Sequence, residues 1–154
     1  MLQLVRARVD QPDPALAEIP LEIDRLTLAK RRWRTIAPDG AEFGFELDAP
    51  LQHGDTVHQT AVARYVIRQR PESVVEISLA LAPSAAAGIG WAIGNLHLEL
   101  SAEATRLLAP DEPAVRQLLQ RLSVPFTSTT AIFRPGRFAR SQQPAHELGA
   151  SHRH

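Results

Sequence analysis

A single histidine, His97, closes a run of small residues in the middle of the chain and is the side chain best placed to bind a metal. It follows residues 85–93, which are alanine, glycine and isoleucine with one tryptophan, and then Gly94, Asn95 and one leucine. Glycine and asparagine most readily adopt the left-handed conformation that closes a helix. We therefore predict that a helix ends at Gly94 and Asn95 and that His97 opens a strand.

The residues after His97 alternate in polarity and predict which way the imidazole faces. In a strand, Leu98 and Leu100 would share one face, and His97, Glu99 and Ser101 would share the other. The imidazole would then point away from the apolar side, where a metal ion or another protein can reach it. The alternative is an ordinary surface histidine that only forms hydrogen bonds.

The carboxyl end of the chain is a second place where histidines gather. Residues 141–154 contain His146, His152 and His154, three of the six histidines, and almost no large apolar side chain. Such a segment is expected to be a mobile tail. Neutral imidazole suits nickel, copper and zinc, so tail histidines could close over an ion and release it. The alternative is a solvated tail without a metal.

Composition limits the other candidate functions. Of 154 residues, 44% are apolar and 22% charged, and 17 basic side chains balance 17 acidic ones, which argues against capture of nucleic acid or an anionic membrane. The chain has no cysteine, so a metal must be held by His, Asp or Glu. The chain contains no apolar run long enough to suggest a membrane span. We expect a cytoplasmic protein.

The first seventy residues read as strands and turns, which predicts a small all-β domain over 1–70, of a type that binds a partner or peptide. We assign residues 26–28 to a strand, because the first seventy residues show no helical periodicity. Pro38-Asp39-Gly40 is typical of a tight turn, and the alternation around Phe43 and Phe45 then predicts a hairpin. Residues 68–71 are interpreted as the linker.

Beyond Pro71 the pattern changes to alternating strands and helices. We expect a strand over 75–81, a helix capped by Ser84, strands over 98–101 and 105–109, a helix capped by Asp111, and a strand over 129–133. In the second helix, apolar residues recur at helical spacing: Val115, Leu118, Leu119 and Leu122. The order strand, helix, strand, strand, helix, strand is ferredoxin-like. The predicted fold class is α+β, with this domain over 71–140 and the tail over 141–154.

Together these features resemble the urease accessory protein UreE family over most of the chain. The matching residues are Arg31, Arg32 and Arg34, Pro38-Asp39-Gly40, Leu51 with Gly54-Asp55, Gly94-Asn95-Leu96-His97, and the tail histidines. The resemblance implies a nickel metallochaperone without enzymatic turnover. It implies a homodimer in which His97 of each subunit meets at the two-fold axis, with His146, His152 and His154 as auxiliary ligands. The cargo would be Ni²⁺, with Zn²⁺ or Cu²⁺ at the same site, and the partners a urease accessory GTPase and the urease maturation complex.

The chain also departs from this family in three places. Leu96 stands where the family usually has arginine, and residues 109–112 are Ala-Pro-Asp-Glu where some members carry histidines. The tail is much shorter than the polyhistidine tails of some members. We therefore expect few metal ions per dimer.

Two other functions remain open from the sequence alone. A protein-interaction or peptide-binding adaptor with incidental metal binding is the first. The second is an RNA-binding domain that uses Arg31, Arg32, Trp33 and Arg34, with tryptophan stacking on a base. Glu42 and Glu46, on the expected partner strand, favour a paired sheet surface instead. His53 and His58 are interpreted as ordinary surface residues, and no catalytic motif supports an enzyme.

Overall fold

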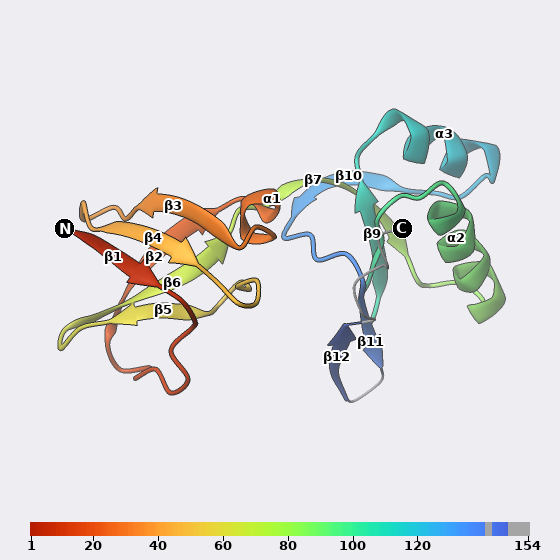
Figure 1. Cartoon of the computed structure of the whole chain (residues 1–154). Helices are drawn as coiled ribbons and strands as arrows, with labels where there is room; N and C mark the ends of the chain where they lie inside the picture. Colours follow the sequence, from red (N-terminus) through yellow and green to blue (C-terminus); the bar gives the residue numbers. More distant parts are fainter. Residues whose placement is uncertain (141–142, 148–154) are drawn as a thin grey trace. The chain divides into compact units, whose positions relative to one another are not determined.

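The computed structural model describes residues 1–140 and 143–147 (Figure 1). The chain divides into two compact units, with the boundary between Arg70 and Pro71. Strands dominate both units and helices are few, so the α+β class is confirmed.

Unit 1 consists of two small sheets that enclose one core. Its elements are β1 (Leu2–Val5), β2 (Ala17–Ile23), α1 (Arg25–Leu28), β3 (Arg32–Ile36), β4 (Glu42–Glu46), β5 (Thr56–Gln59) and β6 (Ala63–Gln69). The strand orders are β1-β4-β3 and β2-β6-β5. Both sheets contribute apolar side chains to a shared core, including Phe43, Phe45, Leu21 and Ile67. Unit 1 is therefore held together by burial between two sheets.

The predicted hairpin is present as β3 and β4. The two strands pair antiparallel, with Arg32 opposite Glu46, and Gly40 has the positive φ of 88° that the turn requires. Alternation in β4 turns Phe43 and Phe45 into the core and leaves Gly44 on the other side.

The assignment of residues 26–28 to a strand was wrong. They belong to the short helix α1, and the Asp24 side chain accepts a hydrogen bond of 2.8 Å from the backbone N–H of Thr27. One turn is too short to show helical periodicity, and the N-cap aspartate was the signal available in the sequence.

A hydrogen bond ties the hairpin turn to the second sheet of unit 1. The Tyr65 hydroxyl donates to Asp39 Oδ2 at 2.7 Å. This bond lowers the pKa of Asp39 below its ordinary value of 3.8, and it raises the pKa of Tyr65 above 10.0, because the carboxylate accepts the phenolic proton. The bond therefore stabilises unit 1 at neutral pH. Its contribution is lost on the acid side as Asp39 protonates below pH 3.8, and on the alkaline side as Tyr65 ionises above pH 10.0.

We expect Tyr65→Phe to lower the urea midpoint of unfolding at neutral pH, and the difference from the wild type to shrink as pH falls below 3.8. In the variant, the Asp39 pKa should rise toward its ordinary value, which a carbon NMR titration of the carboxyl groups measures. Asp24 is the internal control, because its pKa is lowered by Thr27 and should not move. An unchanged Asp39 pKa in Tyr65→Phe would contradict the assigned cause.

Unit 2 is built around one larger sheet. Its elements are β7 (Glu72–Ser78), α2 (Pro83–Asn95), β8 (Ser101–Ala102), β9 (Arg106–Pro110), α3 (Pro113–Arg121), β10 (Thr127–Ala131), β11 (Arg137–Arg140) and β12 (Gln143–Glu147). The strand order is β10-β7-β9-β8-β11-β12. From β7 to β10 the elements follow the strand, helix, strand, strand, helix, strand order.

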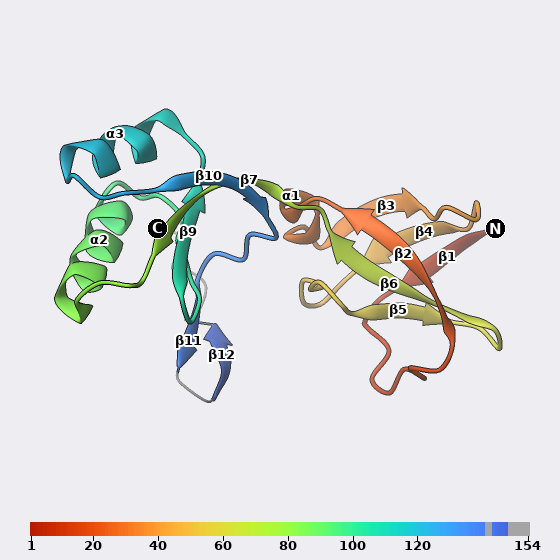
Figure 2. The ribbon, with the colours of Figure 1, turned by 180° about the vertical axis from the view of Figure 1, so that it is seen from behind.

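Both longer helices cover the same face of this sheet, as the two opposite views show (Figures 1 and 2). Helix α3 buries Val115, Leu118 and Leu119 as its spacing predicts, and α2 contributes Ile89 and Ile93 to the same core. On the other face a small second core surrounds Phe133. Packing of both helices through these apolar stripes fixes the position of the α2 end on the sheet.

Both predicted helix caps in unit 2 were wrong by one or two residues. Helix α2 begins at Pro83 with Ala82 as N-cap, so Ser84 lies inside the helix. Helix α3 has Glu112 as N-cap, while Asp111 pairs with Arg116 through two hydrogen bonds. In both helices a proline at the first position determines the start, because its fixed φ suits that position.

In the part of the chain that the structure describes, no helix combines the length and the apolar character needed to cross a membrane.

Candidate metal centre

The structure places His97 at the end of α2 and not at the start of a strand, which corrects the prediction. Gly94 and Asn95 are still helical, and His97 itself adopts the left-handed conformation, with φ of 56°. Its backbone N–H donates to the carbonyl of Gly94 at 2.9 Å, and that of Leu98 donates to Ile93 at 3.4 Å. These two bonds form a Schellman motif with His97 at the position where glycine is usual.

Histidine at this position has a conformational cost. A left-handed φ brings the Cβ of an L-residue close to the following carbonyl, at roughly 1–2 kcal/mol, although histidine is one of the residues enriched there. Only His97 and Ser123 adopt positive φ among the non-glycine residues that the structure describes. Backbone strain of this kind tends to be retained at functional positions.

The orientation predicted for the imidazole is nevertheless correct, for a different reason. His97 and Glu99 are exposed, whereas Leu98 and Leu100 pack against the core of unit 2. Ser101 is buried, at 3% exposure, and does not share their surface. The two leucines anchor an irregular segment. Exposed and partly buried side chains therefore alternate over residues 97–100, although β8 begins only at Ser101.

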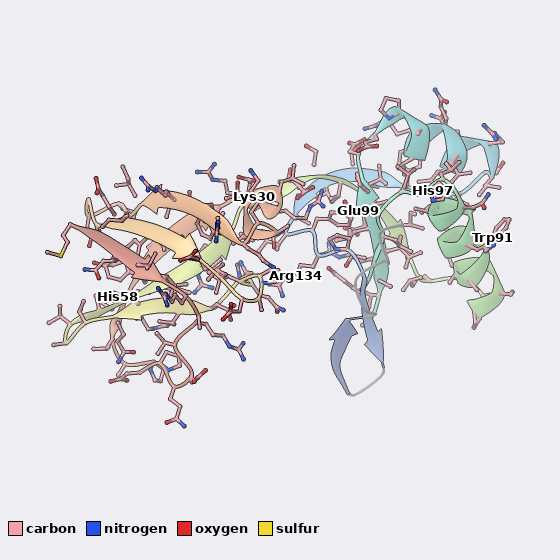
Figure 3. The ribbon with its side chains drawn as sticks, in the orientation of Figure 1. Lys30, His58, Trp91, His97, Glu99 and Arg134 are labelled. Atoms are coloured by element: carbon pink, nitrogen blue, oxygen red, sulfur yellow. The ribbon has the colours of Figure 1, made fainter. Side chains whose placement is uncertain are left out.

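The outward face of α2, next to His97, is apolar and uncovered within the described chain. Trp91 is 72% exposed and projects from the helix away from the sheet (Figure 3). A Cβ added at Gly88 or Gly94 would meet no atom within 4 Å, so these glycines do not serve packing inside the chain. A helix that is apolar on all sides is normally buried. Small residues around the whole helical period are the signal of this face in the sequence.

Of the three tail histidines, the structure describes only His146. His146 lies in β12, where its backbone is in register with Phe138 of β11. His152 and His154 lie outside the described residues. Among the described residues, the structure brings no group of three or more His, Asp or Glu side chains together.

The remaining histidines have contacts inside unit 1. His53 Nδ1 accepts a hydrogen bond of 3.0 Å from the backbone N–H of Gln69. The His58 ring lies against Phe43 and Tyr65, with centroid distances of 5.9 and 5.7 Å.

The basic segment before and within β3 is partly a paired sheet surface. Arg32 forms a salt bridge of 2.9 Å with Glu46 across the hairpin, as the paired-surface interpretation predicts. The Trp33 ring stacks on Phe45 at a centroid distance of 3.7 Å on the core side of the strand. An aromatic ring held in this way is not presented to a nucleic-acid base.

Fold and site thus define a two-unit α+β protein. Its candidate metal-ligating residue, His97, lies on the surface at the end of α2, the first helix of unit 2. Residues 72–154 match the family model described as the C-terminal domain of the UreE urease accessory protein. A protein named urease accessory protein UreE from Deinococcus radiodurans is 36% identical over 125 residues, which cover 79% of this chain and 77% of the relative. The protein of that name from Beijerinckia indica is 31% identical over 88% of this chain and 79% of its own length. One from Bifidobacterium longum is 34% identical, but the match spans only 44% of that protein.

The chain therefore belongs to the urease accessory protein UreE family.

Proposed function

We propose that this protein is a nickel metallochaperone that carries Ni²⁺ for assembly of the urease active site. The family membership and the names of the relatives support an accessory role in urease maturation. The observation that carries the proposal is the exposed imidazole of His97, held at a strained backbone position beside an uncovered apolar helix face.

The site is completed by a second copy of the chain. A Ni²⁺ ion takes more ligands than one imidazole supplies. If the outward faces of two α2 helices meet around a two-fold axis, the interface buries Trp91 and brings two copies of His97 together. The open positions at Gly88 and Gly94 allow two helix backbones to approach closely. We propose that the homodimer forms in this way.

Auxiliary ligands come from His146, His152 and His154, and water fills the remaining positions. Imidazole nitrogen also suits Zn²⁺ and Cu²⁺, so these ions compete for the same site, and the biological preference for nickel depends on supply and partner. The protein transfers its cargo without turnover to a urease accessory GTPase within the maturation complex, in the cytoplasm.

Calorimetric titration with Ni²⁺ tests this proposal, with the dimer mass measured by sedimentation in parallel. His97→Ala is expected to weaken the tightest site, at about one ion per dimer, by at least about 100-fold, because both central ligands are lost together. His152→Ala is the matched control, which removes one auxiliary histidine and should change the affinity by less. If His97→Ala leaves the tightest site unchanged, His97 is not the central ligand and the proposal fails.

A further inference from the structure

The outer face of the β1-β4-β3 sheet in unit 1 turns an unusual set of side chains to solvent. The strand register places Leu4, Gly44 and Arg34 side by side in one row, and Leu2, Glu42 and Ile36 in the next. Strand alternation puts these residues on the face opposite Phe43 and Phe45, which are in the core. This surface is called the outer face below.

Three large aliphatic side chains are exposed together on the outer face. Leu2 is 43% exposed, Leu4 57% and Ile36 67%. Gly44, in the central strand, lets the Leu2 side chain lie across it, since a Cβ there would be only 3.3 Å from Leu2 Cδ2. Glycine weakens the interior of a strand and marks places where another group approaches closely. Aliphatic exposure clustered in this way is typical of a binding surface.

One end of the outer face is basic. Arg6, Arg31 and Arg32 line a hollow together with Glu46, Leu47 and Asp48. Arg32 is paired with Glu46, but Arg6 and Arg31 make no ion pair within the described residues. Lys30, labelled in Figure 3, directly precedes this group in the chain. Unpaired guanidinium groups in a hollow favour carboxylates, which they bind through two parallel hydrogen bonds.

We propose that the outer face docks an acidic segment of a partner protein, with an aliphatic side chain on Leu2, Leu4 and Ile36 and carboxylates on Arg6 and Arg31. A protein segment fits better than an anionic lipid surface, because a segment can place an uncharged side chain opposite Glu42, which lies between Leu2 and Ile36, whereas a lipid surface presents phosphates to the whole face. It fits better than a nucleic acid, because Trp33 is stacked on Phe45 and does not lie on this face.

The test uses a short blocked peptide of alternating glutamate and leucine, titrated into the full chain without nickel. Backbone NMR resonances of β1, β3 and β4 are expected to shift. A lysine and leucine peptide should not bind, and a glutamate and serine peptide should bind at least about tenfold more weakly, because it has no aliphatic side chains. Oligothymidine and vesicles of anionic phospholipid are tested in the same way.

Two variants test whether the aliphatic and the basic side chains of the outer face both contribute to peptide binding. Leu4→Glu and Arg31→Glu are each expected to weaken peptide binding by at least about tenfold. The matched controls are Val62→Glu, at a position 75% exposed in another part of unit 1, and Arg121→Glu in unit 2, and both should bind as the wild type does. Circular dichroism checks that each variant is folded.

Three results would overturn the inference: no binding of the acidic peptide, binding that neither Leu4→Glu nor Arg31→Glu weakens, or preferential binding of oligothymidine or vesicles. Nickel titration of both variants separates this surface from the proposed metal site. The nickel affinity should be unchanged, so the docking inference and the nickel proposal can fail independently.

Discussion

Gly88→Arg in α2 is expected to convert the proposed dimer into monomers while the subunit stays folded. In the chain itself the substitution meets open space, and replacing glycine inside a helix should add about 0.5–1 kcal/mol of stability. In an apolar interface between two α2 helices, the same side chain would bury an unpaired charge. We expect the dimer dissociation constant to rise at least about 100-fold, measured by sedimentation equilibrium.

The nickel affinity of Gly88→Arg should fall along with the dimer, although the substitution removes no metal ligand. Ala114→Arg is the matched control, because Ala114 is exposed on α3 and lies outside the proposed interface. That variant should remain dimeric and bind nickel as the wild type does. A Gly88→Arg protein that dimerises normally would show that the outward face of α2 is not the subunit interface.

His97→Gly is expected to stabilise the protein and at the same time remove its proposed central metal ligand. At φ of 56°, histidine carries a strain that glycine does not, so the free energy of unfolding without metal should rise by about 1 kcal/mol. This corresponds to a rise in Tm of roughly 2–8 °C for a unit or chain of this size. Thermal unfolding in the presence of a chelator measures the gain, and nickel calorimetry measures the loss.

His97→Ala separates the two effects of this substitution. Alanine also removes the imidazole but keeps a Cβ, so it should lose nickel binding without the gain in stability. Equal unfolding temperatures for the glycine and alanine variants would indicate that the left-handed backbone at position 97 stores no strain. After such a result, the ligand role of His97 would depend only on the nickel titration, because backbone strain would no longer support it.

Elements whose signals are local could be predicted from the sequence. The β3 and β4 hairpin follows from a proline, aspartate and glycine turn and from the alternation around Phe43, both of which act over a few residues. The buried face of α3 follows from the spacing of Val115, Leu118 and Leu119. The boundary at Pro71 coincides with a change in residue pattern. The ligand candidate, His97, was also visible, because its neighbours have distinctive types.

Only the tertiary structure decided how His97 is presented and which surfaces are uncovered. Gly94 and Asn95 could each have closed the helix, but packing of Ile93 and Leu98 into the core extends α2 and moves the left-handed turn to His97. The burial of a side chain depends on which residues distant in sequence pack around it, so a local sequence pattern does not predict it. For the same reason the exposure of Trp91 on α2, and the aliphatic cluster and the hollow lined by Arg6, Arg31 and Arg32 in unit 1, became apparent only in the folded chain.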